Sequence, residues 1–167
     1  MEGSQGGVTI RTEQPDDRAA VAEVVEAAFG DRAVARLVEA IRATSNFVPD
    51  LTLVASVHDR VVGHVMISMV ALDDDGTRTE VASLSPLAVA PPFQGRGIGS
   101  ALVREVTERA DRRGEPLVVL EVPHGIHITL PSWAPPEAAQ IIRLRRYDPA
   151  LRGGVVYPPA FEKVTED

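Results

Sequence analysis

The chain has 167 residues, which is enough for one domain with a substantial core. Its 24 acidic and 17 basic side chains give a net charge of −7, which argues against general binding to nucleic acid or to anionic membranes. The absence of cysteine excludes disulfides and thiol catalysis and is compatible with a cytoplasmic protein, and no apolar run is long enough to cross a bilayer.

The first third of the chain predicts a short strand followed by two helices. Residues 8–11 form the strand candidate. A proline and two acids open a helix over residues 15–29, and Gly30 is placed to end it. Asp31 is the predicted cap of a second helix whose apolar stripe reaches residue 41.

The next part predicts three consecutive strands, over residues 51–57, 61–72 and 80–89. The last two are separated by Asp73-Asp74-Asp75-Gly76, in which Asp-Gly is a strong hairpin signal. Three successive aspartates could suggest a metal site, but they lack the alternating ligands and the terminal glutamate of a calcium loop. We therefore interpret this run as a solvated turn and expect no metal.

The third strand leads into a loop with the sequence Gln94-Gly95-Arg96-Gly97-Ile98-Gly99-Ser100. An apolar stripe that begins at Ile98 predicts a helix immediately after it, and Gly114 is placed to end that helix. A glycine-rich loop at a helix N-terminus directs several backbone N–H groups toward one point, where the helix dipole favours an anion. The spacing matches neither the dinucleotide fingerprint nor the P-loop.

The pattern Gln-x-x-Gly-x-Gly over residues 94–99 resembles the acetyl-CoA loop of the GNAT superfamily of N-acetyltransferases, in particular its small bacterial members. The resemblance covers residues 8–161, which we expect to be a single domain between flexible termini at 1–7 and 162–167. It implies the α/β (α+β) GNAT acyl-CoA N-acyltransferase fold, in which helices flank a mixed central sheet. It also implies acetyl-CoA as the acyl donor.

The resemblance assigns the donor site to the third strand and the loop. The Leu87 N–H matches the position that polarises the thioester carbonyl, and the Val89 backbone matches the position that pairs with the pantetheine amides. Backbone N–H groups of the loop would hold the pyrophosphate, with added charge from Arg96. The full set of implied cofactor-binding residues is Leu87, Ala88, Val89, Gln94, Gly95, Arg96, Gly97, Ile98, Gly99 and Ser100.

The general base is a separate question. Some relatives carry a glutamate four residues before the position of Leu87, where this chain has Ser83, whose hydroxyl can hold a water that passes on a proton. Glu80 on the same strand is a second candidate that the residues themselves suggest, although an exposed carboxylate at a strand end is the more common role. Glu121 on the next strand is a rival, and His64 is expected to pack rather than catalyse.

The chain departs from the family pattern after residue 122. A strand over residues 117–122, parallel to its predecessor, is followed directly by His124, where relatives have a helix with a tyrosine that serves as the acid. His124 and His127 lie near this gap and are titratable. Residues 137–147 are ambiguous between helix and strand, and we predict a strand that forms a hairpin with Val155. The gap predicts slow transfer and increased hydrolysis of the donor.

The leading interpretation is an acetyl-CoA-dependent N-acetyltransferase that acts on a primary amine of a small molecule or peptide. The alternative is a weak or inactive GNAT-like module that binds acetyl-CoA or CoA as a sensor or interaction domain. A third interpretation is a chain that folds poorly because its sheet lacks a connection. The sequence predicts no nucleic-acid or membrane partner, is compatible with a homodimer, and does not identify the amine.

Overall fold

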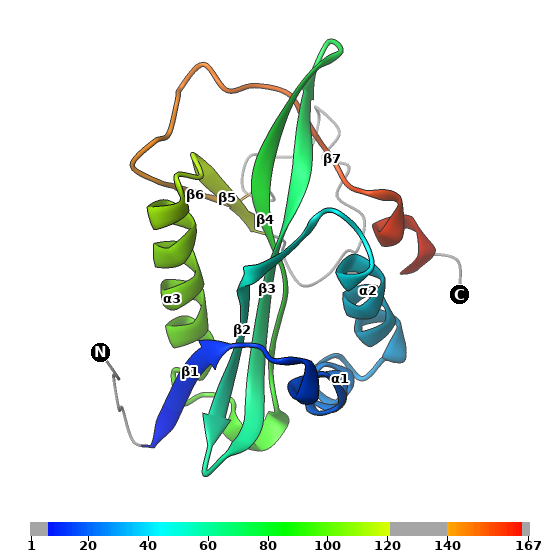
Figure 1. Ribbon diagram of the computed structural model, residues 1–167, viewed down its shortest axis with the longest axis vertical. Coiled ribbons are helices and arrows are strands. Elements are labelled where there is room, and N and C mark those ends of the chain that lie inside the picture. The colour runs from blue at the N-terminus through cyan, green and yellow to red at the C-terminus, as the bar shows by residue number, and fades with distance from the viewer. Residues whose placement is uncertain (1–6, 121–139, 165–167) are drawn as a thin grey trace.

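The computed structural model describes residues 7–120 and 140–164. Within these ranges seven strands form one sheet, with α3 on one face and α1 and α2 on the other (Figure 1). Short 3₁₀ helices occupy Pro15–Asp17, Pro91–Phe93 and Pro159–Val164. The other elements are β1 (Val8–Thr12), α1 (Arg18–Phe29), α2 (Arg32–Arg42), β2 (Phe47–Val57), β3 (Arg60–Asp74), β4 (Thr77–Val89), α3 (Ile98–Arg113), β5 (Leu117–Leu120), β6 (Gln140–Arg143) and β7 (Gly154–Val156).

The sheet has the order β1-β2-β3-β4-β5-β6. The long strand β3 pairs with β2 in its first half and with β7 nearer its end, at residues 71–73. Only the β4–β5 pair is parallel among these pairings, and α3 forms the connection between its two strands. The described residues therefore form the mixed sheet flanked by helices that the sequence predicts.

One strand pairing differs from the prediction. A strand does form within residues 137–147, but β6 pairs antiparallel with β5, whereas Val155 of β7 pairs with Leu72 of β3. The predicted hairpin between these two segments is therefore wrong. Alternating side chains indicate that a segment is a strand, but they do not indicate which open sheet edge it will join.

The helix ends follow the local signals in the sequence. Gly30 ends α1 with a φ of 68°, and Gly114 ends α3 with a φ of 93°, a left-handed conformation that glycine adopts without steric cost. The Asp31 side chain accepts a hydrogen bond from the Ala33 N–H at 2.8 Å, so it caps α2 as predicted.

The core lies on both faces of the sheet. On one face α3 buries Ile98, Leu102, Val106 and Ala110 against β2, β3 and β4. Gly63 of β3 permits this close approach, because a Cβ there would lie 3.0 Å from Leu102 Cδ1. On the other face, α1 and α2 bury their own apolar stripes.

The acidic turn between β3 and β4 is a hairpin, as its Asp-Gly pair predicts. Asp75 and Gly76 have φ values of 48° and 91°, and the Asp73 carboxylate accepts hydrogen bonds from the Gly76 N–H and from Arg78. These bonds hold the pKa of Asp73 below its usual value, with the Gly76 N–H as the main cause. In the described ranges no three His, Cys, Asp or Glu side chains are grouped so that they could hold a metal ion.

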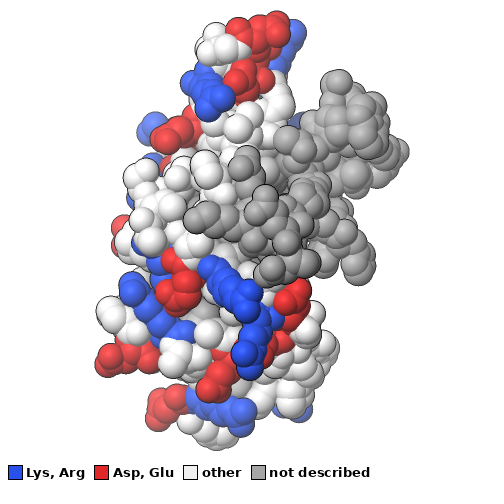
Figure 2. Space-filling view, turned by 90° about the vertical axis from the view of Figure 1, so that its right-hand side faces the viewer, with Lys and Arg blue, Asp and Glu red and all other residues white. Residues whose placement is uncertain are grey.

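The surface carries both signs of charge. On the face with α2 and the C-terminal segment, acidic and basic side chains are interspersed among the described residues (Figure 2). None of the described helices is both long enough and apolar enough to cross a membrane.

Candidate active site

The site begins with an irregularity in β4. Leu84 lies opposite Ile67 of β3 and Leu87 lies opposite Val65, so the two β4 residues Ser85 and Pro86 face a single β3 residue. Such a β-bulge changes which face the following side chains point to. Leu84 and Leu87, three residues apart, consequently both contact the core beneath α3. The bulge thus places the Leu87 side chain on the face of the sheet that α3 covers.

The end of β4 also lacks a strand on one side. Its parallel pairing with β5 runs from Ala82 to Leu84 and goes no further among the described residues, whereas β4 continues to Val89. Backbone groups along the last residues of β4 are therefore placed to pair with an extended ligand, as an added strand would.

The loop after β4 has the geometry of an anion site. Gly95 and Gly97 have φ values of 75° and 82°, which place the loop backbone across the start of α3. Gly97 is the N-cap and provides no side chain, so no capping side chain covers the first N–H groups of α3. These groups and the helix dipole together create a positive potential at the end of β4.

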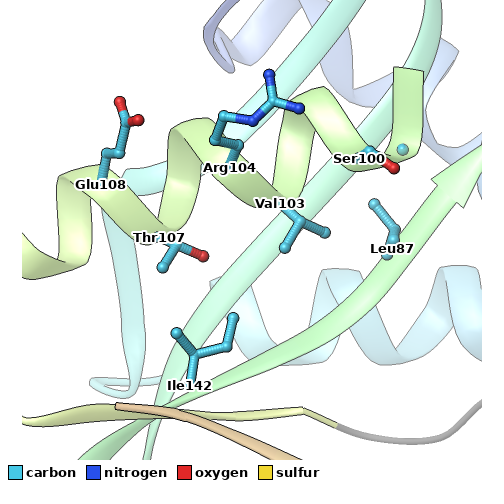
Figure 3. A pocket seen from close by; sticks show the side chains of 8 residues that line it. Leu87, Ser100, Val103, Arg104, Thr107, Glu108 and Ile142 are labelled. Carbon is cyan, nitrogen blue, oxygen red and sulfur yellow. The ribbon is translucent and has the colours of Figure 1, made fainter. Parts of the chain in front are cut away.

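A cleft of about 610 Å³ runs along α3 from this loop (Figure 3). In Figure 3, Val103 and Thr107 of α3 point toward the strands, where Leu87 and Ile142 form the opposite wall. Gly99 has no side chain to place in the cleft, and a Cβ there would lie 3.7 Å from the Val89 side chain and 3.9 Å from that of Leu87. The complete lining is Leu87, Gly99, Ser100, Val103, Arg104, Thr107, Glu108 and Ile142.

Polar side chains lie on the opposite face of the sheet, beneath α1 and α2. Ser83 of β4 and Ser68 of β3 are direct cross-strand partners, and both are fully buried. Neither hydroxyl has a hydrogen-bond partner among the described residues. Buried hydroxyls without partners are costly, so this pair marks a polar spot under the site that a bound water or a substrate group can satisfy.

The same face contains a buried charged group next to a histidine. Arg42 of α2 donates two hydrogen bonds to the Glu13 carboxylate, and both side chains are 4% exposed. His64 lies beside them, with Nδ1 3.9 Å from Glu13 Oε1, and is fully buried. Burial, together with the positive charge of Arg42, lowers the pKa of His64 to about 3. His64 is therefore neutral at physiological pH.

This combination of a bulged strand, a glycine-rich loop and an uncapped helix start agrees with a comparison to known families. Residues 18–126 match the model of the acetyltransferase (GNAT) family, which is well over half of the chain. The chain belongs to the GNAT family. In this GNAT chain α3 follows the glycine-rich loop, and β4 is the bulged strand before that loop.

Curated relatives match over part of their length. An uncharacterized N-acetyltransferase of Escherichia coli, YjhQ, is 30% identical over 96 residues, which is 58% of this GNAT chain and 53% of the relative. An acetyltransferase of Photorhabdus laumondii is 40% identical over 82 residues, covering 49% of this chain and 52% of the relative. The chain thus spans about half the length of the curated relatives it matches.

Two solved structures match over nearly the whole chain. A GNAT family acetyltransferase from Brucella melitensis, solved in complex with acetyl-CoA, superposes with a TM-score of 0.75 at 29% identity, covering 94% of this chain and 99% of that one. The GNAT family protein YhbS from Escherichia coli, solved with CoA, has a TM-score of 0.79 at 24% identity, covering 97% and 96% of the two chains. The second similarity shows the GNAT fold alone.

Three of the ten residues that the sequence assigns to the donor site line this cleft, and the other seven adjoin them in sequence. Leu87, Gly99 and Ser100 line the cleft, and Ala88, Val89 and residues 94–98 border it along the chain. Two side chains have additional contacts. Gln94 Nε2 donates to the Val89 carbonyl at 2.9 Å, which fastens the GNAT loop to β4, and the Arg96 guanidinium lies 5.3 Å from the centre of the Phe93 ring.

The candidate bases on β4 lie at different distances from Leu87. Glu80 is exposed and lies seven residues before Leu87, which is about 23 Å along an extended strand. Ser83 is nearer, at about 13 Å by the same measure, and is buried. Glu121, His124, His127 and the predicted gap after Val122 lie outside the described residues.

Sequence reasoning missed Ser68 and the far wall of the cleft. Ser68 is a polar residue in an otherwise apolar stretch of β3, which is a hint that the sequence contains. Its importance follows from the strand register, which places it opposite Ser83 and which the sequence does not give. Ile142 becomes part of the cleft only because β6 pairs with β5.

Proposed function

We propose that this chain is an acetyl-CoA-dependent N-acetyltransferase that acts on a primary amine of a small molecule or peptide. The observation that carries the proposal is the cleft between α3 and the end of β4, which joins an anion-binding helix start to an unpaired strand segment. A diphosphate followed by an amide-containing arm fits these two features in sequence. Membership of the GNAT family and the acetyl-CoA complex of the Brucella relative support the same donor.

The chain contributes to donor binding mainly through its backbone. In this proposal the N–H groups of residues 95–100 bind the diphosphate, and Arg96 adds charge above Phe93. The edge of β4 at Leu87, Ala88 and Val89 pairs with the pantetheine arm, and the Leu87 N–H donates to the thioester oxygen. Because Gln94 already occupies the Val89 carbonyl, we expect the Val89 N–H and the Leu87 backbone to make these contacts.

Acetyl transfer forms a bond between the amine nitrogen and the acetyl carbon and breaks the carbon–sulfur bond of the donor. The amine must lose a proton, and direct transfer requires a base within about 3 Å. We propose that the Ser83 and Ser68 hydroxyls hold a water that passes this proton on to solvent, because both are buried on the side opposite the donor cleft and have no partner among the described residues. Glu80 is farther along β4 and can take part only through a longer chain of waters. The leaving thiolate takes its proton from solvent.

Steady-state thiol release with a panel of primary amines tests this function, with mass spectrometry of the product to confirm amine acetylation. We expect amine-dependent thiol release and a Ser83→Ala variant with kcat lowered about ten- to a hundredfold at unchanged KM for acetyl-CoA. Thr79→Ala, which removes an exposed hydroxyl from the same strand, is the control and should leave both constants unchanged. Acetyl-CoA binding without any amine-dependent product would contradict the proposal.

One observation favours the alternative of a CoA-binding module with little catalysis. From Val81 to Val89, β4 carries no carboxylate and no histidine, so none of its side chains there can take a proton at neutral pH. The same experiment separates the two functions, because a binding module retains CoA affinity but yields no acetylated amine.

A further inference from the structure

One arginine on α3 differs from the others on that helix. Arg109 and Arg112 lie within ion-pair distance of Glu105, and Arg113 pairs with Glu115. Arg104 is exposed and has no ion-pair or hydrogen-bond partner within the part of the chain that the structure describes. It is also the basic residue in the lining of the α3 cleft. A free guanidinium at a cleft is available for a ligand.

The position of Arg104 relates it to the glycine-rich loop. It lies four residues after Ser100, one helical turn or about 6 Å along the axis, on the same side of α3. Its side chain extends back toward the N-terminal end of α3 in Figure 3, whereas Glu108 lies a further turn away. The guanidinium thus stands beside the anion-binding helix start without being part of it.

The donor of the proposed function has more phosphate than the loop can bind. CoA carries a diphosphate and, on its ribose, a separate 3′-phosphate with two negative charges. The uncapped N–H groups at the start of α3 are few and suit one anionic group, the diphosphate. The second group requires another donor nearby, and the planar fork of an arginine matches a phosphate monoester in shape and charge.

We propose that Arg104 binds the 3′-phosphate of the acyl donor and makes the site select CoA over 3′-dephospho-CoA. This proposal rests on the proposed function and adds the residue that sets donor specificity. Arg96 lies in the loop itself, over the Phe93 ring, and in this proposal it binds the diphosphate. The diphosphate is present in both CoA and 3′-dephospho-CoA, so Arg96 does not distinguish them.

Calorimetric titration of CoA and of 3′-dephospho-CoA into the full chain tests the proposal. We expect the wild type to bind CoA about tenfold more tightly than dephospho-CoA. Arg104→Gln should lose this preference by weakening CoA alone, and Arg104→Lys should retain part of it. Arg112→Gln removes the same charge from the same helix outside the cleft and should behave as the wild type, whereas Arg96→Gln should weaken both compounds alike.

Each contrary result has a distinct meaning. Equal affinity of the wild type for the two compounds, or an equal loss of both in Arg104→Gln, would overturn the role of Arg104 and leave the donor site intact. Failure of the wild type to bind either compound would overturn the donor site and this proposal with it. Because Arg104 is exposed, a melting curve is sufficient to show that its variants remain folded.

Discussion

His64 illustrates how burial decides the role of a titratable residue. Its ring, on β3, is fully buried, with the Arg42–Glu13 pair beside it. Because burial and the charge of Arg42 disfavour the imidazolium, the pKa of His64 falls to about 3. The sequence-based expectation that His64 packs rather than catalyses agrees with this placement.

The low pKa of His64 predicts a pH-dependent stability. An unfolded chain protonates this histidine below about pH 6.5, whereas the folded chain does not until about pH 3. The folded state therefore binds fewer protons in this window, and stability falls as the pH is lowered through it. Urea unfolding between pH 7 and pH 4 should show that His64→Leu reduces the slope by about 1.4 kcal/mol per pH unit.

An exposed histidine provides the control for this measurement. His58 lies in the β2–β3 turn with a φ of 49°, a conformation that asparagine tolerates, so His58→Asn removes an exposed histidine without straining the turn and gives the slope for comparison. If His64→Leu kept that slope as well, the histidine would have to be protonated or exposed in the folded chain.

At the scale of elements, a single carboxylate fixes the corner between β1 and α1. Asp17 accepts two hydrogen bonds from the Arg11 guanidinium, at 2.6 and 2.8 Å, and one from the Gln14 N–H at 2.7 Å. The Arg11 bonds are the main reason that the pKa of Asp17 lies below its usual value.

Asp17→Asn should therefore destabilise the fold by about 1–2 kcal/mol at pH 7, because the charge-assisted pair with Arg11 is lost. The loss is no larger because Arg11 is partly exposed and solvent screens its charge. The carboxylate stabilises the fold above its unfolded pKa of about 3.9, so the difference between variant and wild type should shrink as the pH falls below about 4. Asp16→Asn, at the exposed neighbour, is the control in the same urea titration. Equal effects of the two substitutions at pH 7 would show that the Asp17 contacts contribute nothing.

Elements with local signals were predictable from the sequence, and those that depend on distant partners were not. The Asp31 cap, the Asp75-Gly76 turn and the glycine ends of α1 and α3 each depend on neighbours within a few residues. The pairing of β6 with β5 and of β7 with β3 depends on which sheet edges remain open after the rest has folded. The predicted hairpin failed for this reason.

At the scale of the whole molecule, the sheet and its helices create the cleft. The loop motif predicted where the cleft begins, because a glycine-rich turn and a helix start are adjacent in sequence. Its far wall at Ile142 and the cross-strand pair Ser68–Ser83 could not be predicted, because strand register and order bring these residues together. The sequence therefore predicted the loop at which the cleft begins, but not its far wall or the Ser68–Ser83 pair.

The cleft also indicates which substitution should close it. A Cβ at Gly99 would lie in ordinary van der Waals contact with the Val89 and Leu87 side chains, so alanine fits there, whereas the two further methyl groups of valine have to enter the cleft or press on these side chains. Gly97 is less suitable, because its φ of 82° would strain any replacement.

Calorimetric titration of CoA into the wild type, Gly99→Ala and Gly99→Val tests directly whether the donor binds between α3 and β4. We expect a low-micromolar or tighter Kd for the wild type, similar binding by Gly99→Ala, and binding at least about tenfold weaker for Gly99→Val, with a melting curve to confirm that each variant is folded. Absence of CoA binding to the wild type at about 1 mM, or equally tight binding by Gly99→Val, would contradict the placement of the donor between α3 and β4.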